Sequence, residues 1–191
     1  MTKVEMAWTD VPGRLMASLP RYYFRGKGSM EQVTPQLFIG DLGDDRYVAG
    51  REGWAIIHAE REIHRRYGQI HRLPLRDTFL TPDGTELFLA FEDALRMGEV
   101  NTRCILPAIE FAHRHVARGH RVLIHCVAGL SRSPAIAMLY LLKYTDVLPR
   151  TNIFDAIFSF SEIYPLYDPN DGLLPYTTGF LEEIRGTVES R

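Results

Sequence analysis

The sequence has little cysteine, little net charge and no long apolar stretch. Two cysteines in 191 residues exclude a disulfide framework and suit a reducing compartment. A net charge of −2 at pH 7 provides no general basic field that would recruit nucleic acid or an anionic membrane. The longest uninterrupted apolar run, Ala135 to Leu142, is too short to span a bilayer, and the first ten residues carry charges where a signal peptide needs an apolar core. We therefore expect a cytoplasmic protein without a membrane partner; its oligomeric state is left open.

The remaining composition is that of one ordinary globular domain, with 46% hydrophobic and 24% charged residues. Residues 1–30 mix aromatic and basic residues without a period, so we expect an arm there and a single domain over residues 31–191. Short apolar stretches predict strands at 33–40, 54–58, 86–93 and 122–125. Helical spacing predicts helices at 105–119, from Ser133 onward, within 149–163, where the aromatic residues are assigned to the core, and at 177–185.

The segment around residue 105 lies between two of these strands. A strand, a helix and a second strand in that order form the right-handed crossover of a parallel sheet. We therefore predict a single α/β domain with a central, mostly parallel sheet that is flanked by helices.

The most informative stretch is HCVAGLSRS, residues 125–133, which joins a predicted strand to a predicted helix. Such a loop can direct successive backbone N–H groups into one concave space, with the positive end of the helix dipole behind them. These donors bind an oxyanion and also stabilise a cysteine thiolate, which makes Cys126 a candidate nucleophile. Arg132 adds a planar fork that can hold two phosphate oxygens. The predicted phosphate-binding residues are Val127, Ala128, Gly129, Leu130, Ser131 and Arg132.

HCVAGLSRS resembles the H-C-x5-R-S/T signature of the cysteine-dependent protein phosphatases. Its A-G-x-S-R-S pattern is most similar to the dual-specificity branch. VTPQLFIG, residues 33–40, also resembles the first strand of that branch. The pattern W-A-I-I-H-A-x-R-E-x-x-H-R resembles a group of bacterial and phage proteins of this kind, and extends the likeness over about residues 33–180. The resemblance implies hydrolysis of phosphate monoesters through a cysteinyl-phosphate, without a metal or organic cofactor. It also implies that Ser133 assists the leaving thiolate and that His125 supports the loop.

This chemistry needs a carboxylic acid that protonates the leaving oxygen. Asp93 lies 33 residues before Cys126, and the resemblance favours a separation of about thirty. Asp77, the last residue of the segment L-P-L-R-D, lies 49 residues before Cys126 and is the alternative acid. Glu92 is a weaker candidate, because alternation along the predicted strand would point it the other way.

Arginine and histidine are concentrated between residues 58 and 76. His58, His64 and His71 are six and seven residues apart, which matches no usual pair of metal ligands, so no metal site is predicted. A charge run of this kind is more often a solvated face. A second anion-binding patch that includes His58, His64 and Arg65 is the minority interpretation.

The four variable loop positions, Val127, Ala128, Leu130 and Ser131, are all uncharged. A multiply charged substrate would reward lysine there, so the loop favours a phosphorylated protein, carrying phosphotyrosine, phosphoserine or phosphothreonine. The arginine-rich segment favours a polyanion instead: a nucleotide, an RNA 5′-phosphate or a phosphoinositide. A module that binds phosphate without turning it over is a third possibility. Cys104 is expected to be a buried helix residue rather than a resolving thiol.

Overall fold

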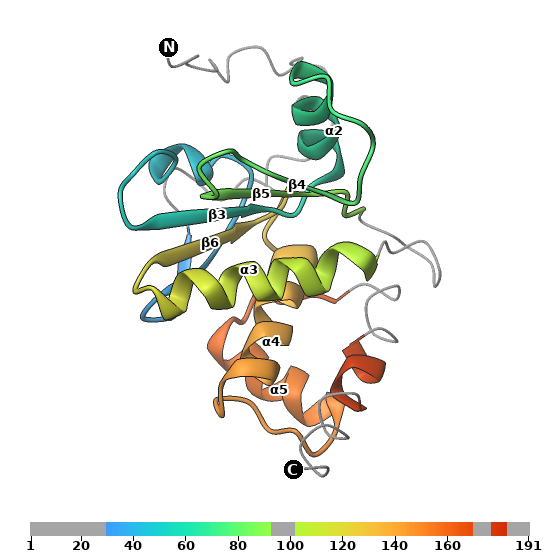
Figure 1. The fold of residues 1–191 in the computed structure, drawn as a ribbon. Coiled ribbons are helices and arrows are strands. Elements are labelled where there is room, and N and C mark those ends of the chain that lie inside the picture. Colours follow the sequence, from blue (N-terminus) through green and yellow to red (C-terminus); the bar gives the residue numbers. More distant parts are fainter. Residues whose placement is uncertain (1–29, 93–101, 170–176, 183–191) are drawn as a thin grey trace.

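The structure is a computed structural model that describes residues 30–92, 102–169 and 177–182 (Figure 1). The sheet has six strands in the order β1-β2-β6-β3-β5-β4. Their bounds are β1 Glu31–Thr34, β2 Leu37–Gly40, β3 Trp54–His58, β4 Thr78–Leu80, β5 Glu86–Leu89 and β6 Arg121–His125. The four central strands run parallel, whereas β1 and β4 pair antiparallel with β2 and β5 at the two edges. The predicted α/β fold with a mostly parallel sheet is confirmed.

Helices cover both faces of this sheet. The longer ones are α2 Arg61–Ile70, α3 Ile105–Ala117, α4 Arg132–Tyr144 and α5 Ile153–Ile163, with short 3-10 turns η3 Asp45–Tyr47 and η4 Thr102–Cys104; residues 177–182 are also helical. In Figure 1, α3, α4 and α5 lie on one side of the sheet and α2 on the other. The main core forms between α3, α4, α5 and the sheet. In the described ranges, no helix combines the length and the apolar character that crossing a membrane requires.

The two central strands β3 and β6 are apolar on both faces because both faces are covered. Ile57 and Ile124 pack into the main core, whereas Ile56 and Leu123 face the opposite side. Side chains alternate along a strand, so the last residues of β3 and β6 share the face of Ile56 and Leu123. A pair of histidines, one ending each strand, therefore faces the side that η3 covers.

Three sequence-based predictions need correction. Residues 33–40 form two strands, because the turn at Pro35 folds the chain back and the Thr34 hydroxyl accepts a hydrogen bond from the Leu37 N–H at 3.1 Å. The strand predicted at 86–93 ends at Leu89. In α5, which Asn152 caps by accepting from the Asp155 N–H, only part of the aromatic set is core: Phe160 is buried, but Phe154 and Phe158 are each 69% exposed.

Candidate active site

The predicted phosphate loop lies between the end of β6 and the start of α4. Cys126 directly follows β6 and is 2% exposed. The Ser133 hydroxyl, in the first turn of α4, donates a hydrogen bond to the Cys126 sulfur at 3.2 Å. The positive end of the α4 dipole and this hydroxyl both favour a negative charge on the sulfur. The structure thus brings together the predicted nucleophile and the residue expected to assist it.

The loop backbone is held by hydrogen bonds to its carbonyl groups. Three carbonyls accept from outside the loop: Val127 from the Leu42 N–H at 3.1 Å, Gly129 from the Tyr164 hydroxyl at 2.8 Å and Leu130 from the Asp168 N–H at 2.8 Å. In the part of the chain that the structure describes, the N–H groups of residues 127–131 donate no hydrogen bond. Carbonyls bonded outward and N–H groups left for an anion are the features of an oxyanion-binding nest.

Gly129 is required by this backbone path. Its φ is 70°, a left-handed conformation that other residues adopt at a cost. A Cβ atom at this position would also lie 3.2 Å from the carbonyl oxygen of Gly40 and 3.3 Å from the Tyr164 hydroxyl. The glycine therefore allows the loop to approach β2 and Tyr164 closely.

Arg132 is anchored by residues that lie beyond the ends of two other strands. Its Nη1 donates to the Glu60 carboxylate at 2.5 Å and to the Phe91 carbonyl at 3.3 Å. The side chains of Arg132 and Glu60 are 5% and 14% exposed, so this ion pair is nearly buried. Glu60 also caps α2, where its side chain accepts from the Glu62 N–H at 3.0 Å. The guanidinium plane is thus fixed before any phosphate binds.

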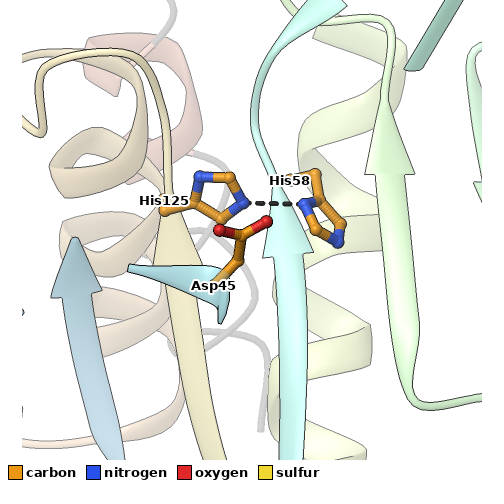
Figure 2. Close-up of side chains that lie close together, drawn as sticks. All are labelled: Asp45, His58 and His125. Atoms are coloured by element: carbon orange, nitrogen blue, oxygen red, sulfur yellow. Dashed lines mark hydrogen bonds between the residues drawn. The ribbon is translucent and has the colours of Figure 1, made fainter. Parts of the chain in front are cut away.

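His125 supports the loop from behind. Its Nε2 lies 2.7 Å from the Nδ1 of His58, and the His58 Nε2 lies 3.1 Å from the Glu86 carboxylate. The His125 carbonyl accepts from the Ala59 N–H at 2.8 Å. Burial, with His58 as a further cause, lowers the pKa of His125 to about 3, so its ring is neutral near pH 7. Figure 2 shows these rings with the Asp45 side chain below their contact.

The structure describes two of the three candidate acids, Asp77 and Glu92. Asp93 lies outside the described residues. Asp77 is half-buried at the start of β4, and its carbonyl accepts from the Ala90 N–H at 2.9 Å, just past the end of β5. Asp77 therefore lies at the C-terminal end of the parallel strands, which is the end of the sheet that carries the phosphate loop. Glu92 is 39% exposed and forms an ion pair with Arg61.

The structure does not assemble His58, His64 and Arg65 into a surface patch. His58 and His64 are each 1% exposed, and the His64 ring stacks on Phe79 at 4.4 Å. Arg65 lies on the exposed face of α2 and pairs with Glu62 at 2.6 Å. The helical period explains the difference: residues 64 and 65 lie about 100° apart around α2 and so point to different faces, and residue 58 belongs to the sheet.

Cys104 is fully buried at the start of α3, as expected. Burial raises the pKa of its thiol to about 12, so a thiolate does not form there near neutral pH. This environment gives no support to a resolving-thiol role.

Glu60, Tyr164 and the contact between His58 and His125 were not found from the sequence. Each is a contact between segments at least 35 residues apart, and such contacts leave no local pattern. One signal was available for the histidines. Both predicted strands end in histidine. Adjacent parallel strands that end at the same level in a sheet bring their last side chains together.

Residues 97–169 match the family model described as dual specificity phosphatase, catalytic domain. Dual specificity protein phosphatase 22-B of zebrafish (Danio rerio) is 25% identical over 162 residues, which cover 82% of this chain and 78% of that protein. Dual specificity protein phosphatase 22 of mouse (Mus musculus) is 28% identical over 117 residues, 61% of this chain and 56% of that protein. These relatives are vertebrate proteins, so they do not support the expected likeness to bacterial and phage proteins.

Solved structures share the fold. The crystal structure of DUSP15 is 25% identical with a TM-score of 0.57, and the similarity covers 85% of this chain and 96% of that one. A mouse putative dual specificity phosphatase complexed with zinc tungstate is 20% identical, with a TM-score of 0.61 and coverage of 85% and 92%. PTPMT1 in complex with PI(5)P is 18% identical, with a TM-score of 0.60 and coverage of 83% and 98%.

Proposed function

We propose that this chain is a dual-specificity phosphatase, which hydrolyses phosphate monoesters on proteins through a cysteinyl-phosphate intermediate. The observation that carries the proposal is the loop itself. It has a thiol at one end, an anchored arginine at the other and backbone N–H groups that no described residue uses. A phosphate dianion suits this arrangement of donors and charge, and the sulfur lies at its base.

The reaction has two displacements. In the first, the Cys126 thiolate attacks phosphorus, an S–P bond forms and the ester P–O bond breaks while Arg132 and the loop N–H groups hold the equatorial oxygens. In the second, water attacks phosphorus, the S–P bond breaks and inorganic phosphate leaves. The Ser133 hydroxyl, 3.2 Å from the sulfur, stabilises the departing thiolate. His125 keeps the start of the loop in position and does not touch the substrate.

We assign the general acid to Asp93, with Asp77 as the alternative. Asp93 stands two residues after Phe91, whose carbonyl accepts a hydrogen bond from Arg132. Asp93 gives its proton to the leaving oxygen and afterwards takes one from the attacking water. Because a poor leaving group needs this proton most, Asp93→Asn should slow a phosphoserine peptide much more than p-nitrophenyl phosphate. Asp77→Asn is the matched variant, and a selective loss in Asp77→Asn instead would reverse the assignment.

Phosphorylated protein is the proposed substrate, with phosphotyrosine, phosphoserine and phosphothreonine all accepted. The variable loop positions Val127, Ala128, Leu130 and Ser131 bring no extra cation for a multiply charged ligand. Two of the three arginines of α2 already have carboxylate partners, because Arg61 pairs with Glu92 and Arg65 pairs with Glu62. A reducing compartment such as the cytoplasm is the proposed setting, since the nucleophile must remain a thiol.

A substrate panel tests the proposal: phosphotyrosine, phosphoserine and phosphothreonine peptides, nucleotides, an RNA 5′-phosphate and phosphoinositides, each with wild type and Cys126→Ser. Wild type should release phosphate fastest from a phosphopeptide, and Cys126→Ser should lower turnover by about a thousandfold or more while tungstate still binds. Faster release from a polyanion would identify that substrate class instead. Tungstate binding without turnover by wild type would indicate a phosphate-binding module.

A further inference from the structure

Three buried side chains from three separate elements meet behind the phosphate loop. They are Asp45 of η3, His58 at the end of β3 and His125 at the end of β6, and they are 3%, 1% and 0% exposed. One ligand atom of each, a carboxylate oxygen or an imidazole nitrogen, lies within 4.8 Å of the other two. Figure 2 shows the Asp45 carboxylate directed at the contact between the two rings.

The hydrogen bonds of the two rings leave one hydrogen to be shared by these three ligand atoms. The His58 Nε2 faces the Glu86 carboxylate, which only accepts, so this nitrogen carries the hydrogen. The 2.7 Å contact between the His58 Nδ1 and the His125 Nε2 holds a single hydrogen, which one ring donates to the other. The Asp45 carboxylate points at the same place, where that one hydrogen is already shared.

The charge of Asp45 is also poorly matched. Its side chain accepts a hydrogen bond from the Arg46 N–H at 2.8 Å, and among the described residues no lysine or arginine forms an ion pair with it. Arg132 acts electrostatically on His125, but it is itself paired with Glu60. A buried carboxylate whose oxygen lies within 4.8 Å of a nitrogen from each of two buried imidazoles is a site that gains from a cation.

We propose that Asp45, His58 and His125 bind one divalent transition-metal ion, with Zn²⁺ as the best fit. Two nitrogens and one carboxylate oxygen are donors that Zn²⁺ accepts, whereas Mg²⁺ and Ca²⁺ prefer oxygen alone. Two nitrogens on one tetrahedral Zn²⁺ lie about 3.3 Å apart, so the two rings, now in contact at 2.7 Å, separate by roughly 0.6 Å. When both rings ligate the ion, the hydrogen of His58 lies on Nε2 and that of His125 lies on Nδ1, a buried atom that accepts no hydrogen bond in the structure.

Glu86 completes the arrangement. A histidine that ligates a metal usually donates its other N–H to a carboxylate, which fixes the tautomer and the ring orientation. Glu86 already accepts from the His58 Nε2 at 3.1 Å, and Phe88 stacks on the same ring at 4.2 Å. The His58 ring is thus held with its Nδ1 directed at the site. The ion would join η3 and β3 to the strand that carries the phosphate loop.

The sequence-based expectation of no metal site rested on the spacing of His58, His64 and His71. The group proposed here contains only the first of these. Its other members lie 13 residues before and 67 residues after His58, so ligand spacing along the chain gave no sign of it.

The test uses full-length protein in a Cys126→Ser background, because the loop thiolate is a competing Zn²⁺ ligand. After removal of metal with a chelator, the protein is titrated with Zn²⁺ alone, and bound zinc is counted by mass spectrometry after desalting. We expect about one Zn²⁺ per chain. Co²⁺ in place of Zn²⁺ should give the intense visible absorption of a four-coordinate site. A parent protein that retains no zinc would overturn the proposal.

Asp45→Asn and His58→Asn, made in the same background, should each abolish stoichiometric binding. Glu86→Gln should weaken binding by about 10- to 100-fold, the usual loss for such a supporting carboxylate. The matched control is His120→Asn, which removes one ring of another close histidine pair, His115 and His120, whose Nδ1 atoms are 3.0 Å apart. That pair has no third ligand among the described residues, so its loss should leave zinc binding unchanged.

Unchanged binding in Asp45→Asn, or its loss in His120→Asn, would refute the assignment. If a ligand variant fails to fold by circular dichroism, X-ray absorption at the zinc edge of the parent decides the matter. Two imidazoles, further oxygen and no sulfur are expected there. Fewer than two imidazoles would exclude the proposed site.

Discussion

Replacing Glu60 tests whether Arg132 must be held by the protein before phosphate binds. Breaking a buried ion pair by removing one partner costs about 3–5 kcal/mol, and the partial exposure of Glu60, 14%, favours the lower end of that range. The substitution also removes the side chain that caps α2, which adds about 1 kcal/mol. Glu60→Ala should therefore lower the free energy of unfolding by about 3–4 kcal/mol. Guanidinium denaturation measures this change.

Glu60→Gln separates the effect on catalysis from the effect on folding. Its single side-chain oxygen can accept from Arg132 or from the Glu62 N–H, but not from both, and the charge is lost. The guanidinium then loses its fixed plane, and a displacement of about 1 Å in such a group can slow a reaction by about 100-fold. We expect kcat/KM for p-nitrophenyl phosphate to fall at least about 10-fold while the protein stays folded.

The matched control is Glu62→Gln on the same helix. Glu62 pairs with Arg65 at 2.6 Å, but both side chains are about half exposed. Exposed pairs of this kind contribute about 0–1 kcal/mol, so stability should change little and kcat/KM not at all. If Glu60→Gln matches Glu62→Gln in kcat/KM, the claim that Glu60 positions Arg132 is refuted.

Three further predictions concern single groups. Tyr164→Phe leaves the buried Gly129 carbonyl without its donor, and should lower the free energy of unfolding by about 1–3 kcal/mol and slow turnover, as measured by denaturation and phosphate release. Iodoacetamide at pH 8 should alkylate Cys126 but spare Cys104, whose buried thiol has a pKa of about 12; peptide mapping that finds both labelled would contradict this. Burial lowers the pKa of His64 below its ordinary 6.5, so the folded state favours the neutral ring. As the pH falls below 6.5, the free energy of unfolding should therefore decrease by up to about 1.4 kcal/mol per pH unit. His64→Gln should reduce this slope in pH-dependent denaturation.

The phosphate loop was predictable because all of its chemistry lies within nine consecutive residues. Cys126, Gly129 and Arg132 mark a turn between a buried strand and a helix, and each residue type answers a local requirement. The order of strand, helix and strand around α3 likewise follows from period and turn signals. Local rules therefore sufficed for the fold class and for the candidate nucleophile.

Contacts across the sheet were not predictable in the same way. The role of Glu60 depends on the register that sets the end of β3 beside the start of α4, and nothing in its own neighbourhood marks it. The segment 58–76 was interpreted as a solvated charge run, yet residues 61–70 of it form α2, with Tyr67 buried against Phe79 and Phe88. Most residues of α2 are charged or polar, so its narrow apolar stripe was not recognised from the sequence. In α5, the exposed Phe154 and Phe158 show the opposite error, in which apolar type alone suggested burial.

The three residues that follow Ile57 contact both ends of the phosphate loop. The His58 ring touches His125, the Ala59 N–H donates to the His125 carbonyl, and Glu60 binds Arg132. The arginine- and histidine-rich segment, for which an anion-binding patch was the minority interpretation, thus begins with residues that support the loop. Because His125 precedes the nucleophile and Arg132 closes the loop, any shift of this segment moves the sulfur and the guanidinium together. The end of β3 therefore positions both the nucleophile and the phosphate-binding arginine.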